Sequence, residues 1–146
     1  GLLAARARPQ RITGFIGIAA APDFTKDMQA GLRADQLETL MAEGVVRIPN
    51  HYSDEPYTIT KLLLEDGPQH FLLTGPLTLT MPVRLLQGMR DDDVPWQTAF
   101  RIQNALQQGG LVDVAVLLIE EGDHRLSRDE DLALLDQQVR QLSGLA

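Results

Sequence analysis

The sequence predicts an α/β protein with parallel strands and flanking helices. Three segments have the pattern of strands, at 12–19, 82–88 and 112–119; the first is almost continuously apolar, and the third is apolar and strongly β-branched. Runs of this kind are typical of strands that are buried on both faces of a parallel sheet. A helical pattern at 95–108 separates the last two, and another follows the third. This alternation favours parallel strands joined by right-handed crossovers.

The first part of the chain contains one strand and a series of shorter elements. Residues 1–9 have the pattern of the middle and end of a helix, and the strand at 12–19 follows them. Between 23 and 81 the sequence indicates short helices and polar turns. The clearest is a helix at 35–43, with Asp35 and Glu38 at capping-box spacing and with an apolar face formed by Leu37, Leu40 and Met41. We therefore expect a core of 1–22 and 82–146 and a helical lid insertion at 23–81.

The two C-terminal helices are predicted from caps and apolar stripes. Pro95 is suited to the start of the helix at 95–108, which Gly109 and Gly110 end. Ser127 to Glu130 has the spacing of a capping box for the last helix. Its apolar residues recur at helical spacing and predict a buried stripe of Leu132, Leu135, Val139 and Leu142.

Composition excludes several classes of function. The net charge is −7 and no segment is dense in Lys or Arg, so we expect no nucleic-acid or anionic-membrane partner. The absence of cysteine excludes disulfides, thiolate metal sites and cysteine nucleophiles. The longest apolar stretches are shorter than the roughly 20 residues of a membrane-spanning helix, and no signal peptide is recognisable at the start. The compartment stays open, because a protein without cysteine can occur in any compartment, and the cytoplasm is the default expectation.

Two polar loops follow predicted strands at the position where open parallel sheets bind ligands. The first contains Asp91 within an acidic run that follows Gly88, and the second contains His124 after Gly122. Loops that leave neighbouring parallel strands at the same end can bring a carboxylate and an imidazole into hydrogen-bond contact. Such a pair is the acid and base of a nucleophile triad.

Other interpretations of these residues are open at this point. The run Asp91, Asp92 and Asp93 could be a helix cap, and His124 could be a structural loop histidine. Asp91, Asp93 and His124 could also hold a divalent metal ion. We favour catalytic Asp91 and His124, with Asp92 and Asp93 as solvated caps and without a metal.

The two loops also resemble a known family. Residues 88–95 are similar to the Gly-x-x-Asp-x-x-Val-Pro acid loop of the α/β-hydrolase superfamily, and residues 122–124 are similar to its Gly-x-His loop. With the stretches 15–25, 52–57 and 122–128, the sequence most resembles the palmitoyl-protein thioesterase-like branch and its bacterial carboxylesterase relatives. The resemblance implies the C-terminal half of an α/β-hydrolase fold, with a small helical lid.

The resemblance implies hydrolysis of a small carboxylic ester or thioester, without a cofactor, by a Ser-His-Asp mechanism. Asp91 would be the acid and His124 the base. No Gly-x-Ser-x-Gly nucleophile motif occurs in the sequence, and by the family's chain order it would precede Gly1. Of the serines, Ser127 fits a helix cap and Ser143 a chain end, so Ser53 in the lid is the surrogate nucleophile to test first. Lid residues that could contact an acyl chain are Phe24, Met28 and Met41.

The same resemblance predicts a partner. In this fold the strand at 14–19 lies beside the strand that carries the nucleophile, so without it a long apolar edge would be open, and such edges recruit another strand. We therefore expect a homo-oligomer or a complementing N-terminal segment. The alternative is a catalytically silent oligomeric or binding fragment that retains the hydrolase fold.

Overall fold

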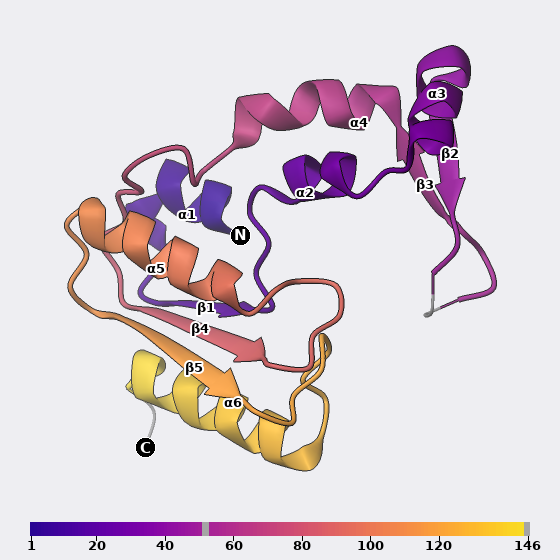
Figure 1. The fold of residues 1–146 in the computed structure, drawn as a ribbon. Coiled ribbons are helices and arrows are strands. Elements are labelled where there is room, and N and C mark those ends of the chain that lie inside the picture. Colours follow the sequence, from indigo (N-terminus) through magenta and orange to yellow (C-terminus); the bar gives the residue numbers. More distant parts are fainter. Residues whose placement is uncertain (51–52, 145–146) are drawn as a thin grey trace. The chain divides into compact units, whose positions relative to one another are not determined.

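The computed structural model describes residues 1–50 and 53–144, which form two compact units. Unit 1 consists of residues 1–22 and 72–146, and unit 2 of residues 23–71 (Figure 1). Tyr52, the first residue of one stretch that carries the family resemblance, lies outside the described residues. Each unit has its own cluster of buried apolar side chains.

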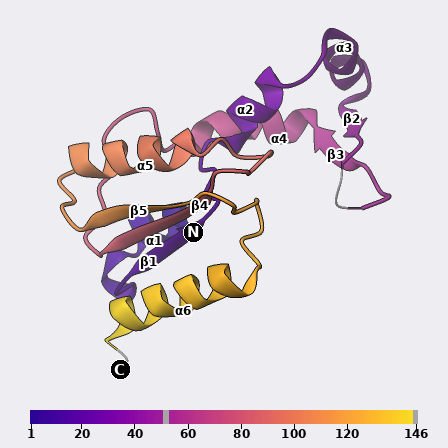
Figure 2. The same ribbon diagram turned by 60° about the horizontal axis from the view of Figure 1, so that its bottom comes forward.

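Unit 1 is built on a parallel sheet of three strands in the order β1-β4-β5. These strands are β1 (Phe15–Ile18), β4 (Val83–Gly88) and β5 (Val114–Ile119), and Val83 pairs with Phe15 on one side and Val114 on the other. Helix α5 (Gln97–Gln108) covers one face of the sheet, and helix α6 (Asp129–Ser143) covers the opposite face (Figures 1 and 2). The predicted α/β fold with parallel strands is confirmed.

The core of unit 1 lies between the sheet and two helices, α5 and the N-terminal α1 (Leu2–Ala7). A short 3-10 helix at Pro9–Arg11 leads from α1 toward β1. The segment 72–81 also belongs to this core, through the buried side chains of Leu72, Leu77, Leu79 and Met81. Unit 1 therefore resumes at Leu72, ten residues before the boundary expected from the strand pattern, because apolar residues without a strand or helix pattern complete its core.

The predicted buried stripe of α6 is wrong at two positions. Leu132 is 49% exposed and Val139 is 43% exposed, whereas Asp131 and Gln138 are buried. The helix turns Asp131 inward because Arg128, and not Ser127, is the N-cap residue, and its guanidinium and backbone N–H both donate to the Asp131 carboxylate. This ion-paired cap fixes the rotation of the helix, and apolar spacing alone does not record it.

In its described part, residues 23–50 and 53–71, unit 2 contains four helical segments and a β-hairpin. The helices are α2 (Phe24–Ala30), α3 (Ala34–Glu43), α4 (Lys61–Asp66) and the 3-10 turn Gly67–His70. Strands β2 (Val45–Ile48) and β3 (Tyr57–Thr60) form the antiparallel hairpin, which the sequence analysis did not predict. Its core joins the helices to the hairpin through Leu40, Val46, Ile59 and Leu64.

The expectation for α3 is only partly met. Leu40 is buried, but Leu37 and Met41 of the predicted apolar face are exposed. The N-cap residue is Arg33, whose backbone N–H donates to the Gln36 side chain at 2.9 Å, so the predicted capping box of Asp35 and Glu38 is wrong. Within residues 1–50 and 53–144, no helix has the length and apolar character that crossing a membrane requires.

Candidate active site

The loops that leave β4 and β5 lie side by side at the carboxyl ends of the strands. We call residues 88–95 the acid loop and residues 120–126 the histidine loop. The backbone N–H of Met89 donates to the Ile119 carbonyl, and the N–H of Arg90 donates to the Gly122 carbonyl, both at 2.9 Å. An ion pair between Arg90 and Glu121 adds a side-chain contact. The parallel sheet therefore delivers both loops to one place.

The two loops approach so closely that one position requires glycine. A Cβ atom on Gly88 would lie 2.3 Å from the carbonyl oxygen of Gly122 and 2.5 Å from that of Asp123. Both obstructing atoms belong to the backbone, so no side-chain movement could make room. Gly88 thus sets the distance between the loops.

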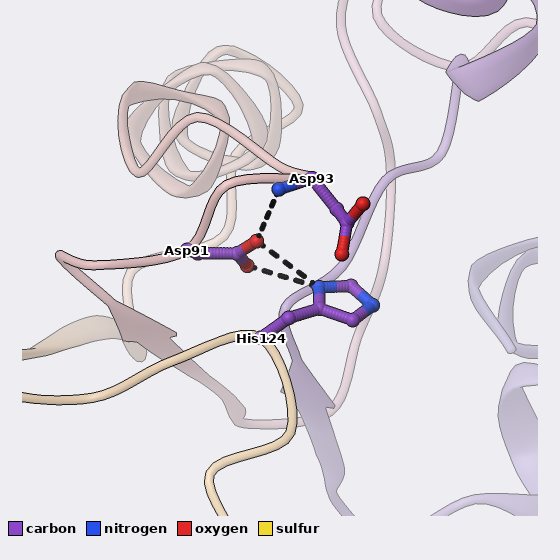
Figure 3. A group of neighbouring side chains, drawn as sticks. All are labelled: Asp91, Asp93 and His124. Atoms are coloured by element: carbon purple, nitrogen blue, oxygen red, sulfur yellow. Dashed lines mark hydrogen bonds and ion pairs between the residues drawn. The ribbon is translucent and has the colours of Figure 1, made fainter. Parts of the chain in front are cut away.

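The Asp91 carboxylate is held by donors on both of its oxygens, and its side chain has an exposure of 0%. Oδ1 accepts hydrogen bonds from the backbone N–H groups of Asp93 at 2.9 Å and Val94 at 2.8 Å. Oδ2 accepts one at 2.8 Å from the side-chain amide of Gln87. Nδ1 of His124 lies 3.2 Å from Oδ1 and 3.1 Å from Oδ2 (Figure 3).

These contacts keep the buried carboxyl ionised. Burial opposes the charge of Asp91, but hydrogen bonds from the Val94 N–H, from His124, from the Asp93 N–H and from Gln87 together outweigh it. The pKa of Asp91 therefore lies below the ordinary value for an aspartate. At neutral pH the histidine faces an anion.

The position of the anion defines what His124 can do. An ionised carboxylate only accepts hydrogen bonds, so Nδ1 of the neutral ring carries the proton and Nε2 has the lone pair. Nε2 lies on the side of the ring away from Asp91 (Figure 3). An imidazole oriented in this way can take a proton at Nε2, while the carboxylate stabilises the resulting cation.

The histidine loop is held by its own contacts. The Asp123 carboxylate accepts hydrogen bonds from the backbone N–H groups of Arg125 and Leu126, both at 2.9 Å. Leu126 has a φ of 44°, in the left-handed region that is unfavourable for a leucine. Its side chain is nevertheless buried, beside Gly122. The turn and the buried leucine together fix the backbone on either side of His124.

Comparisons with known proteins agree with this architecture. No protein-family profile matches the chain. It is 35% identical over 135 residues to mouse palmitoyl-protein thioesterase ABHD10, mitochondrial, and covers 44% of that protein. The same comparison covers 92% of this chain. The bovine protein of the same name is 35% identical over 133 residues, which are 90% of this chain and 42% of that protein.

Solved structures give the same result in three dimensions. A putative hydrolase from Agrobacterium vitis S4 superposes with a TM-score of 0.86 at 32% identity, over 96% of this chain and 56% of that one. Mouse alpha/beta hydrolase domain-containing protein 10 superposes with a TM-score of 0.83 at 33% identity, over 98% and 56% of the two chains. The chain therefore has the fold of part of an α/β hydrolase, as the sequence resemblance implied. It spans less than half the length of the curated relatives it matches.

Within this α/β-hydrolase fold, Asp91 and His124 are in hydrogen-bond contact. Their catalytic roles stay predictions. Asp92 and Asp93 are both exposed, and their assignment as solvated caps stays a prediction. Asp93 also supplies its backbone N–H to Asp91 and directs its carboxylate toward the His124 ring (Figure 3).

The metal interpretation can be weighed against the same geometry. Asp91, Asp93 and His124 offer ligand atoms that all lie within 4.8 Å of one another. However, three protein N–H groups besides the histidine already donate to Asp91. A cation at Nδ1 of His124 would also have to replace the contact with Asp91. The donor set therefore fits a hydrogen-bonded acid and base better than a metal site.

Gln87 is the residue of this site that the sequence analysis missed. It is the penultimate residue of β4, it is 1% exposed, and it donates to Asp91. The available signal was a polar residue at the end of an otherwise apolar strand, directly before the glycine of the acid loop.

The serines of the chain are all exposed. Ser53 lies in unit 2, in a turn where its hydroxyl donates to the Glu55 carbonyl at 2.8 Å. Ser127 precedes the N-cap of α6, and Ser143 donates to the Val139 carbonyl at 2.7 Å in its last turn. The role of Ser53 as a surrogate nucleophile stays a prediction.

The expected acyl-contacting residues lie in unit 2 and differ in exposure. Phe24 is 46% exposed and Met41 is 58% exposed. Met28 is partly buried and packs against the core of unit 2. Phe24 and Met41 thus have apolar surface available for a ligand, whereas part of the Met28 side chain is used in packing.

Proposed function

We propose that the chain supplies the acid, Asp91, and the base, His124, of a Ser-His-Asp hydrolase that acts on carboxylic esters or thioesters. The observation that carries the proposal is the 3.1 Å contact between Nδ1 of His124 and a fully buried carboxylate. This contact orients the imidazole and stabilises its charged form, which is the task of the acid in a triad.

In the proposed reaction His124 transfers a proton in each of two half-reactions. Nε2 takes the proton of a serine hydroxyl as the serine oxygen attacks the acyl carbonyl. It then gives this proton to the leaving group, which is the oxygen of an alcohol or the sulfur of a thiol. A water molecule then attacks the acyl carbonyl of the acyl-enzyme and loses a proton to Nε2. Nε2 gives that proton to the serine oxygen as it leaves. Asp91 remains an anion throughout, and the chemistry requires no cofactor.

The proposed nucleophile lies on a segment outside the printed sequence, because no Gly-x-Ser-x-Gly motif occurs in it. We propose that this segment is either a complementing N-terminal part or a partner chain that associates along β1. Strand β1 pairs with β4 on one side, so Ile16 and Ile18 direct their backbone groups to the other side. If the proposed segment does not supply a serine, Ser53 is the first residue of this chain to replace.

The substrate class follows from the proposed chemistry and from the relatives. Proteins with a similar sequence are named palmitoyl-protein thioesterases, which supports an acyl thioester or ester as the substrate. Phe24, Met28 and Met41 are proposed to contact the acyl chain. The relatives are also named mitochondrial, so the cytoplasmic location that we expect for this chain needs its own test by fractionation.

The test is hydrolysis of short- and medium-chain p-nitrophenyl esters by the purified protein in the form in which it occurs. Replacing His124 by alanine should lower kcat by about 10³-fold or more, because the proton transfer loses its carrier. His70→Ala is the matched control, since His70 also contacts a carboxylate, that of Asp66 at 3.0 Å, but is exposed in unit 2. Turnover unaltered by His124→Ala would discard the proposed site.

The alternative is a catalytically silent fragment, and the missing nucleophile motif is the observation that favours it. The same assay separates the two. Absence of turnover with both esters and acyl thioesters supports the silent fragment, whereas turnover that depends on His124 supports the enzyme.

A further inference from the structure

Gln87 contacts three parts of the acid loop from a buried position at the end of β4. Its side-chain Nε2 donates to Oδ2 of Asp91 at 2.8 Å, to the Val94 carbonyl at 3.2 Å and to the Gly88 carbonyl at 3.3 Å. Gly88 begins the loop, Asp91 lies in its middle and Val94 near its end. One amide group therefore spans the loop that carries the acid.

The surroundings fix which way this amide faces. A carboxylate oxygen and two carbonyl oxygens accept from its nitrogen, and all three would repel the Oε1 atom if the amide were reversed. The NH₂ group must therefore point at Asp91.

The carbonyl half of the same amide lies in a less favourable environment. Oε1 is buried and accepts no hydrogen bond from any described residue. A buried acceptor without a donor is unfavourable, and a leucine or methionine could fill a similar volume without one. Packing alone therefore does not account for a glutamine here, whereas the need for a donor at Asp91 does.

We propose that Gln87 is a positioning residue, whose amide N–H holds the Asp91 carboxylate in the orientation that faces Nδ1 of His124. The consequence for catalysis rests on the proposed function. Oδ1 is held by two backbone N–H groups. On the side of Oδ2, apart from His124 itself, Gln87 is the donor that the structure gives. Without it, the carboxylate can rotate about its bond to Cβ and weaken the contact with the imidazole.

The first test is Gln87→Met in the whole protein, with two measurements. We expect kcat to fall by about ten- to a hundredfold with KM unchanged, because misorientation of the acid affects the reaction more than binding. We also expect the pKa of Asp91, measured by NMR of its labelled carboxyl carbon, to rise because the anion loses a donor. Gln103→Met is the matched control, since Gln103 also donates its side-chain amide, to the Val114 carbonyl at 3.3 Å, but lies in α5.

The second test is Gln87→Glu, which keeps the shape and makes the donor depend on pH. A protonated carboxyl group at this position can donate to Asp91, whereas an ionised one repels it. The ratio of kcat for the variant to kcat for the wild type should therefore fall as the pH rises. Asp91, Asp93 and His124 are present in both proteins, so the ratio reports on the introduced group.

The outcomes separate this inference from the proposed function. If the wild type hydrolyses neither esters nor thioesters, the proposed function fails, but a raised pKa of Asp91 in Gln87→Met still supports the positioning contact. If the wild type is active and Gln87→Met keeps its kcat and its Asp91 pKa, the inference is overturned. A fall in kcat without a rise in that pKa, or a Gln87→Glu ratio that is constant with pH, also contradicts it.

Discussion

A buried anion at Asp91 links the stability of unit 1 to pH. The hydrogen bonds that lower the pKa of Asp91 stabilise its ionised form in the folded state more than the surroundings in an unfolded chain do. Asp91 therefore stabilises the fold in full above the ordinary aspartate pKa of about 3.9. This contribution is lost as the pH falls below that value and through the lower pKa of the folded state.

The corresponding measurement is the free energy of unfolding by urea, from neutral pH to about pH 3, for the wild type and Asp91→Asn. The variant has no carboxyl to protonate, so we expect the difference between the two proteins to be largest near neutral pH and to shrink below about pH 4. Asp131, whose pKa is also lowered, by the side-chain hydrogen bond from Arg128, is present in both and cancels. A difference that is constant with pH would contradict this prediction.

At the scale of residues, the sequence was informative where position and chemistry coincided. Asp91 and His124 could be selected because each lies just after a predicted strand, in a loop with a recognisable motif. Gln87 could not be selected in this way, because strand periodicity does not show which polar side chain at a strand end turns toward the neighbouring loop.

At the scale of elements, the approach of the two loops depends on Gly88. Gly88→Ala would place a methyl group against the carbonyl oxygens of Gly122 and Asp123, so the loops must move apart. We expect a loss of about 1–3 kcal/mol in the free energy of unfolding, as for other overpacked sites. The contact between Asp91 and His124 should lengthen as well, so kcat should fall.

Gly75→Ala is the control for this prediction. Gly75 is in the same unit, and a Cβ there would meet no atom within 4 Å. The Gly75→Ala substitution should therefore change neither the free energy of unfolding nor kcat measurably. If Gly88→Ala behaves like Gly75→Ala, the close approach of the loops is not needed.

The strands and main helices were predictable because long apolar runs and helical spacing of apolar residues indicate burial directly. The rotations and caps of the helices were less predictable. Arg33 and Arg128 occupy N-cap positions that sequence preference gives to Ser, Thr, Asp or Asn, because each arginine forms an ion pair with a nearby aspartate. These local ion pairs replace the predicted capping boxes, and at the start of α6 the side chain that turns inward is Asp131, while Leu132 and Val139 are exposed.

At the scale of the whole molecule, the α/β class followed from the alternation of strands and helices, but the extent of the core did not. Residues 72–81 belong to unit 1 without forming a strand or helix there. The hairpin β2–β3 was also missed, since its strands are short and the sequence between them is long and polar. Contacts between distant segments decide both features, and local periodicity cannot report them.

The outer edge of β1 is where the proposed partner strand can be tested. Phe15 and Ala19 donate their N–H groups to the carbonyls of Pro82 and Leu86, so the alternating residue Ile18 directs its N–H outward. Ile18→Pro removes that donor while leaving the bonds to β4 intact. We expect it to reduce the molar mass in solution if a partner chain binds, or the free energy of unfolding if the strand comes from the same polypeptide. Ile18→Val keeps the N–H and should change neither the molar mass nor the free energy of unfolding. If Ile18→Pro behaves like Ile18→Val in both measurements, no strand is added at this edge.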